Sequence, residues 1–252
     1  MGDGFPFMLR TDLATDRQWP LPSRSHVMRM RWHDLLFAHW PVDPLQINRL
    51  LPGIECETFG GQAWIGVVPF RMTDVAPRYV PAIPGMSAFP ELNVRTYVNL
   101  DGKPGVWFFS LDSPNVIANR VARTFFHLPY MDAKITLREQ DGECHYDSRR
   151  YHRGESPAEF DATYRPTGEE FLARPGTLEY WLTARYCLYT ADRRGNVLRG
   201  EIDHPPWPLQ DAECQIRKNT MLDWLQIQPQ KDEPHLLFSR DLAVQAWLNE
   251  RV

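Results

Sequence analysis

The side chains best suited to chemistry lie in two stretches where polar and apolar residues alternate. Glu91 and Arg95 belong to the first stretch, residues 91–99, and Tyr130 opens the second, residues 130–136. Because successive strand side chains point to opposite faces, each stretch places its polar groups on one face. A carboxyl, a guanidinium and a phenol on a shared wall could bind a small organic acid and exchange protons with it.

The same alternation has a second explanation without any function. An antiparallel sheet with one face in water shows this pattern for solubility alone. The strand expected between the two stretches, residues 105–111, is apolar on both faces, so we expect it to be covered on both. A covered polar face would be a pocket wall, since buried polar groups need partners. The sequence leaves both interpretations open.

Further candidates adjoin these stretches. His127 is the best candidate general base, because a histidine has an unperturbed pKa near neutrality, although such a histidine is more often a hydrogen-bonded structural residue. Guanidinium groups could hold an anion and aromatic rings could line a pocket. The candidate ligand-binding residues of these types are Arg95, Tyr97, Trp107, Arg123, Arg185 and Trp207. For Arg123 the alternative is an exposed charge, and for Trp207 it is a core anchor.

These residues must be positioned by a strand-rich domain. We expect an extended arm over residues 1–25, where Pro interrupts a polar segment, and a single domain over residues 26–252. Turn and alternation signals predict strands at 92–100, 105–111, 127–137 and 143–150, a helix at 113–126, a hairpin at 57–70 and a strand pair at 185–190 and 197–202. They also predict short helices at 44–51, 178–182 and 219–225, and a last strand or helix ending at 247. Four prolines within residues 72–90 predict a long loop.

Composition narrows the function classes. The net charge of −4 gives no reason to expect a nucleic-acid partner. Neither a membrane-length apolar run nor a signal-peptide pattern is present, so we expect no membrane association and a cytoplasmic location. The four Cys and eight His form no metal-ligand spacing, and nucleotide and serine-nucleophile motifs are missing, so we expect no metal and no cofactor.

Several segments together resemble the YqjF-like family of uncharacterised proteins. They are residues 32–40 (WHDLLFAHW), 89–98 (FPELNVRTYV), 105–111 (GVWFFSL), 127–130 (HLPY), Arg185-Tyr186 with Tyr189, and 204–209 (HPPWPL). The resemblance covers most of the chain. It implies no activity, because the function of that family is unknown.

The YqjF-like family is in turn similar to acetoacetate decarboxylases. That similarity implies a fold that is α+β but mainly β, with a large antiparallel sheet curled into a cone-like barrel and a few short helices. In the decarboxylases a lysine forms a Schiff base with the keto acid and a second lysine lowers its pKa. The matching positions here hold Tyr130 and Met131, which cannot form an imine, while Glu91 matches a retained site glutamate. Lys134, the nearby amine, lies four residues beyond Tyr130 on the same face.

Two functions follow from these observations. The first is a pocket for an organic acid or carbonyl compound, oriented by Arg95 and Glu91, with any catalysis being acid–base work by Glu91, Tyr130 or His127. The second is a non-enzymatic binding or structural protein whose old site is filled by Tyr130. A cavity that holds an unexplained ligand, with Glu91 and Arg95 pointing in, would favour the first function, and a closed interior packed by Tyr130 and its neighbours would favour the second. The relatives often self-associate, so a homo-oligomer is compatible with either.

Overall fold

The computed structural model describes residues 16–83 and 85–252. Most of the predicted N-terminal arm, residues 1–15, lies outside this range, and residues 16–27 contain no helix or strand. The described chain forms twelve strands in one sheet. They are β1 (Met28–Val42), β2 (Ala63–Pro77), β3 (Phe89–Leu100), β4 (Lys103–Ser113), β5 (Tyr130–Gln140), β6 (Glu143–Arg150), β7 (Glu159–Phe171), β8 (Cys187–Ala191), β9 (Val197–Asp203), β10 (Leu209–Asn219), β11 (His235–Ala246) and β12 (Glu250–Arg251).

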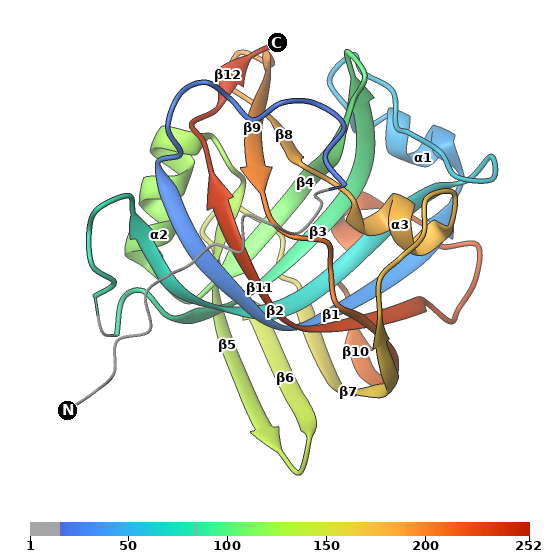
Figure 1. Ribbon diagram of the computed structural model, residues 1–252. Coiled ribbons are helices and arrows are strands. Elements are labelled where there is room, and N and C mark those ends of the chain that lie inside the picture. The colour runs from blue at the N-terminus through green and yellow to red at the C-terminus, as the bar shows by residue number, and fades with distance from the viewer. Residues whose placement is uncertain (1–15, 84) are drawn as a thin grey trace.

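The sheet closes on itself twice. Its order runs β12-β9-β8-β4-β3-β2-β1-β11-β10-β7-β6-β5, and two additional pairings join β4 to β5 and β9 to β11. The first pairing closes a ring of nine strands, and the second closes a ring of seven strands. The strands from β4 through β3, β2 and β1 to β11 belong to both rings. Figure 1 shows β1, β2, β3 and β11 in the middle of the molecule, with β8 and β9 above them and β5, β6 and β7 below.

The shared strands therefore have an interior on each face. On β3, Leu92, Val94 and Val98 belong to the apolar core of the nine-stranded ring. Residues 91, 93, 95 and 97 point the other way and are also buried. On β4, residues 105–113 are buried throughout, as predicted for a strand covered on both faces. A strand with two buried faces must place its polar side chains inside the protein.

Short helices cover the openings between strands. They are α1 (Pro44–Asn48), α2 (Val116–Val121) with a π-helix that continues it (Ala122–Phe126), α3 (Leu178–Thr183) and a 3₁₀ turn (Asp223–Leu225). The Asp43 and Thr177 side chains cap α1 and α3, which confirms the predicted start of each helix. In the part of the chain that the structure describes, every helix falls short of the length and apolar content that crossing a bilayer requires.

Several elements of the structure differ from the prediction. The predicted loop over residues 72–90 is shorter, because β2 continues to Pro77 and pairs with β3 from Met72 and Phe89 onward. Pro77 ends β2 and Pro90 is the second residue of β3, positions where few ladder hydrogen bonds are lost. Strands β1, β7 and β10 were missed. The helix predicted at 219–225 is only the single 3₁₀ turn.

Candidate functional site

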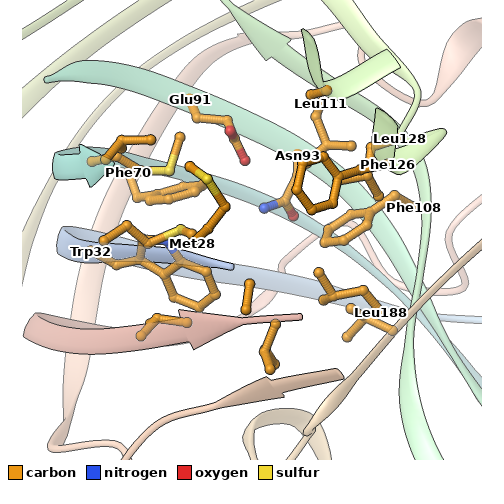
Figure 2. Close-up of a pocket in the computed structure, with 18 of the residues that line it drawn as sticks. Met28, Trp32, Phe70, Glu91, Asn93, Phe108, Leu111, Phe126, Leu128 and Leu188 are labelled. Atoms are coloured by element: carbon orange, nitrogen blue, oxygen red, sulfur yellow. The ribbon is translucent and has the colours of Figure 1, made fainter. Parts of the chain in front are cut away.

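The seven-stranded ring encloses a cavity of about 200 Å³. Every strand of that ring contributes to its wall, and α2 with its π-helix covers one side. Figure 2 shows the arrangement: Met28, Trp32 and Phe70 lie on one side, and Phe108 and Leu128 lie on the other. Between these apolar groups, Glu91 and Asn93 project from β3. The polar groups that reach this cavity are few, which is typical of a small-molecule site.

Glu91 is a buried carboxyl group whose ionisation is suppressed. Its side chain is about 2% exposed, and burial raises the pKa to about 8, while the hydroxyl of Tyr130, which donates to Oε2 over 2.6 Å, partly opposes that rise. Burial also raises the pKa of Tyr130 well above its ordinary value. At neutral pH Glu91 therefore holds a proton on a group that faces an apolar cavity.

Arg95 carries a buried positive charge at the same cavity. Arg95 lines the cavity and is 8% exposed. Its guanidinium lies 5.3 Å from the ring centroid of Phe37 and 5.8 Å from that of Tyr97. Among the described residues no carboxylate forms an ion pair with Arg95, and its Nε has no hydrogen-bond partner. The Oδ1 of buried Asn93, two residues before it, is also unpartnered. Buried polar atoms normally have partners, so these two atoms lack the hydrogen bonds that burial usually requires.

A second buried arginine differs from Arg95 in having its partner. Arg185 also lines the cavity, but it forms an ion pair with Glu57 and donates to the carbonyl of Trp181. Its guanidinium lies 4.9 Å from the ring centroid of Tyr97. Burial lowers the pKa of Arg185, and Glu57 opposes this effect. Of the two arginines at this end of the cavity, Arg95 is therefore the one whose charge no carboxylate of the described residues compensates.

Tyr97 connects these arginines to a buried histidine. The Nε2 of His39 and the hydroxyl of Tyr97 are 2.6 Å apart, and both side chains are fully buried. Burial, followed by the charge of Arg95, lowers the pKa of His39 well below its ordinary value. The neutral imidazole fits only because residue 66 on the neighbouring strand has no side chain: a Cβ at Gly66 would lie 2.5 Å from Nε2.

Gly66→Ala should therefore destabilise the protein by about 1–3 kcal/mol, the usual cost of overpacking a core. Chemical unfolding measures the loss. In a His39→Ala background the same Gly66→Ala change should cost little, because the clashing ring is gone. Equal losses in both backgrounds would show that the contact with His39 is not the cause.

The other candidate residues are distributed over both sides of the Tyr130 strand. Trp207 lines the cavity and stacks on Trp32, with ring centroids 5.8 Å apart. Trp107 instead belongs to the core of the nine-stranded ring. Arg123 donates to the backbone carbonyl of Tyr130 over 2.9 Å. The side chain of His127 is exposed and follows the π-helix in a left-handed conformation.

Trp107, Arg123 and His127 line an open cleft of about 540 Å³ on the far side of Tyr130. Phe108, Leu128 and Tyr130 line both the cleft and the cavity. The structure thus brings Glu91, Arg95, Arg185, Tyr130 and Trp207 to one cavity and separates His127, Arg123 and Trp107 from it.

Several cavity residues were not predicted. Asn93 shares the strand face of Glu91 and Arg95, so the alternation that indicated those residues could also have indicated Asn93. The cavity residues Met30, Met72, His204 and Asn249 come from distant segments, and no local pattern identifies them. Within the described residues there is no group of three or more His, Cys, Asp or Glu side chains placed to hold a metal ion.

Comparison with known proteins places the chain in a family. A family model described as "Uncharacterized conserved protein (COG2071)", DUF2071, matches residues 29–243. The chain belongs to the DUF2071 family. Another relative is "Uncharacterized protein YqjF" of Bacillus subtilis (strain 168), which is 44% identical over 238 residues, covering 94% of this chain and 97% of YqjF. The predicted resemblance to the YqjF-like family is confirmed.

Solved structures share the fold of this DUF2071 chain at low sequence identity. The enduracididine biosynthesis enzyme MppR, complexed with pyruvate, is 12% identical with a TM-score of 0.60, and 91% of each chain is covered. An acetoacetate decarboxylase from Legionella pneumophila is 14% identical with a TM-score of 0.59, covering 97% of this chain and 98% of that one. The predicted mainly β, decarboxylase-like fold is confirmed.

Proposed function

We propose that this DUF2071 chain binds a small organic acid or carbonyl compound in the cavity of the seven-stranded ring, without forming a covalent imine. The observation that carries the proposal is the buried guanidinium of Arg95 at the cavity wall, with which no carboxylate of the described residues forms an ion pair. An uncompensated charge in a protein interior is costly, and a bound carboxylate would compensate it through charge-assisted hydrogen bonds. An anionic ligand therefore fits this end of the cavity better than a neutral one.

The middle of the cavity suits a carbonyl oxygen. A protonated Glu91 is a hydrogen-bond donor, and Asn93 has an amide that can donate or accept there. The Tyr130 hydroxyl donates to one carboxyl oxygen of Glu91, and no described residue forms a hydrogen bond with the other oxygen. A carbonyl compound next to Glu91 could take the proton and return it, so any catalysis at this site would be acid–base chemistry.

The position of the amines argues against an imine. None of the four lysines, all of which lie in the described chain, lines the cavity. Lys134 is exposed on β5, and Lys103 forms an ion pair with Glu201. The position that matches the Schiff-base lysine of the decarboxylases holds Tyr130, whose hydroxyl is bonded to Glu91. Treatment with borohydride and acetoacetate should therefore trap no adduct, and an adduct on Lys134 would contradict the proposal.

The alternative function, a structural protein with a filled site, rests on that same Tyr130–Glu91 hydrogen bond. It predicts a closed interior with no room for a ligand. The volume of about 200 Å³ that both Glu91 and Arg95 face supports binding instead. One structural neighbour, MppR, is complexed with pyruvate, a small organic acid, which agrees with the proposed ligand class.

Substituting Arg95 tests the proposal directly. Isothermal titration with pyruvate, acetoacetate and butyrate should detect binding to the native chain, and Arg95→Met should weaken it about 10- to 100-fold, as expected for losing a hydrogen bond to a charged group. The exposed Arg138→Met is the matched control and should leave affinity unchanged. Equal affinities of the native chain and Arg95→Met would place the ligand elsewhere.

A further inference from the structure

We infer that the preferred ligand is a carboxylic acid with an unbranched apolar chain, about six to ten carbons in all, rather than a three- or four-carbon acid. This inference rests on the proposed function. The carboxylate would lie at Arg95, and the chain would extend past Asn93 and Glu91 to an apolar surface at the other end. We call that surface the methionine wall, formed by Met28, Met30, Met72, Val75, Val244 and Ala246.

The two ends of the cavity lie at opposite ends of the same strand pair. On β2 and β3, Gly66 is opposite Arg95, whereas Met72 is opposite Phe89. Six residues of strand separate these two pairs, which is about 20 Å along the strands. A short acid held by Arg95 would leave the methionine wall without any contact. An acid of six to ten carbons is shorter than this separation of about 20 Å between backbone positions, but the long Arg95 and methionine side chains both line the cavity and shorten the distance that the ligand must span.

The methionine wall is one continuous surface. On β1 and β11, Met28 is opposite Ala246 and Met30 is opposite Val244, and on the other side of β1, Trp32 is opposite Met72. Its members, together with Trp32 and Phe70, lack polar side chains apart from an indole NH. Three thioether side chains give a flexible, polarizable surface that adapts to different chain lengths.

The volume sets the chain length. At about 30 Å³ for a group the size of water, about 200 Å³ holds roughly seven such groups, which is more than pyruvate fills and close to an eight-carbon acid. Each buried methylene should strengthen binding about three- to fourfold until the cavity is full. Longer chains must then displace the wall or leave carbon atoms in water, so affinity should stop rising.

A series of unbranched acids tests this length. Butyrate, hexanoate, octanoate, decanoate and tetradecanoate are titrated calorimetrically into the full chain, with tryptophan fluorescence as a second readout because Trp32 and Trp207 lie in the cavity wall. Octanoate should bind at least 30-fold more tightly than butyrate, and tetradecanoate should bind no more tightly than decanoate.

A larger side chain in the methionine wall should shorten the acid that binds most tightly. Ala246→Leu adds three carbon atoms to the methionine wall and should move the tightest binding to an acid two or three carbons shorter. Ala243→Leu is the matched control, because residue 243 lies on the opposite face of β11 and does not line the cavity. Ala243→Leu should leave the chain length of the most tightly bound acid unchanged.

The outcomes separate this inference from the proposed function. If short acids bind through Arg95 but added methylenes bring no gain, the inference is overturned and the proposed function stands. If long acids bind equally well to Arg95→Met or show no response to Ala246→Leu, they occupy another site and the inference also fails. If no acid of any length binds, both are overturned.

Discussion

Arg150→Met should destabilise the protein by about 3–5 kcal/mol, which is the usual cost of removing one partner of a buried ion pair. Arg150 on β6 donates to both carboxylate oxygens of Asp112 on β4, at 2.7 and 2.9 Å, and to the Ser110 hydroxyl at 2.7 Å. The two charged side chains are at most 1% exposed. Without Arg150, Asp112 must either stay charged in the interior or take up a proton.

The neighbouring arginine provides the control. Arg149 is adjacent on β6 but points outward, with a side chain 66% exposed and 3.5 Å from Asp147. Arg149→Met should change the free energy of unfolding by less than about 0.5 kcal/mol. Urea unfolding of both variants makes the comparison. If both arginine variants lose stability equally, the buried pair does not hold β6 to β4.

Glu91→Gln should stabilise the protein increasingly as pH rises. The pKa of Glu91 is raised from its ordinary value of 4.5 to about 8, mainly by burial. Below pH 4.5 the carboxyl is protonated in both the folded and the unfolded chain. Between pH 4.5 and 8 only the unfolded chain releases the proton, so the native protein loses stability across that window. The penalty is complete above pH 8 and amounts to at most about 5 kcal/mol.

An amide cannot titrate, so Glu91→Gln removes this loss. Thermal or urea unfolding at pH 5, 7 and 9 should show that the stability of Glu91→Gln relative to the native chain increases at each step. Glu55→Gln, at an exposed position, should show no trend with pH. Tyr130→Phe removes the hydrogen bond that lowers the pKa of Glu91, so it should move the window to higher pH. A stability difference between Glu91→Gln and the native chain that is constant from pH 5 to 9 would contradict a raised pKa.

Glu91 and the ion pair of Asp112 with Arg150 lie in the same region of the protein. Asp112 and Arg150 are buried where β4 meets β5 and β6, and the charge of Asp112 contributes to the raised pKa of Glu91. The buried ion pair therefore influences both the joining of the strands and the protonation of the candidate site. Arg150→Met would be expected to alter the titration of Glu91 as well as the stability.

Much of the local structure follows from residue order. Strict alternation and the Asp-Gly turns predicted the β3–β4 and β5–β6 hairpins, and the capping residues Asp43 and Thr177 predicted two helix starts. These signals depend only on neighbours along the chain. Strands β7 and β10 were not predicted, although each pairs with a strand that is next to it along the chain, because most of their exposed residues are polar.

Sequence could not decide which polar face is buried. Residues 91–97 and 130–136 alternate in the same way, yet Glu91, Asn93 and Arg95 are buried whereas Lys134 and Thr136 are exposed. The reason is the topology of the sheet. Strand β3 lies in both rings and has an interior on each face, whereas β5 belongs to the nine-stranded ring alone and turns its polar face outward.

Residue order alone therefore gives the polar groups, Glu91, Arg95 and Tyr130, and their spacing. Tertiary structure decided that Glu91 and Arg95 face a common cavity with Tyr130, that His127 does not, and that Arg95 has no carboxylate partner among the described residues. The double closure of the sheet is the physical cause, and both rings depend on which strands pair in space, including β1 with β11 across most of the chain. Those pairings create the enclosed volume, and enclosure is what turns a polar strand face into a candidate site.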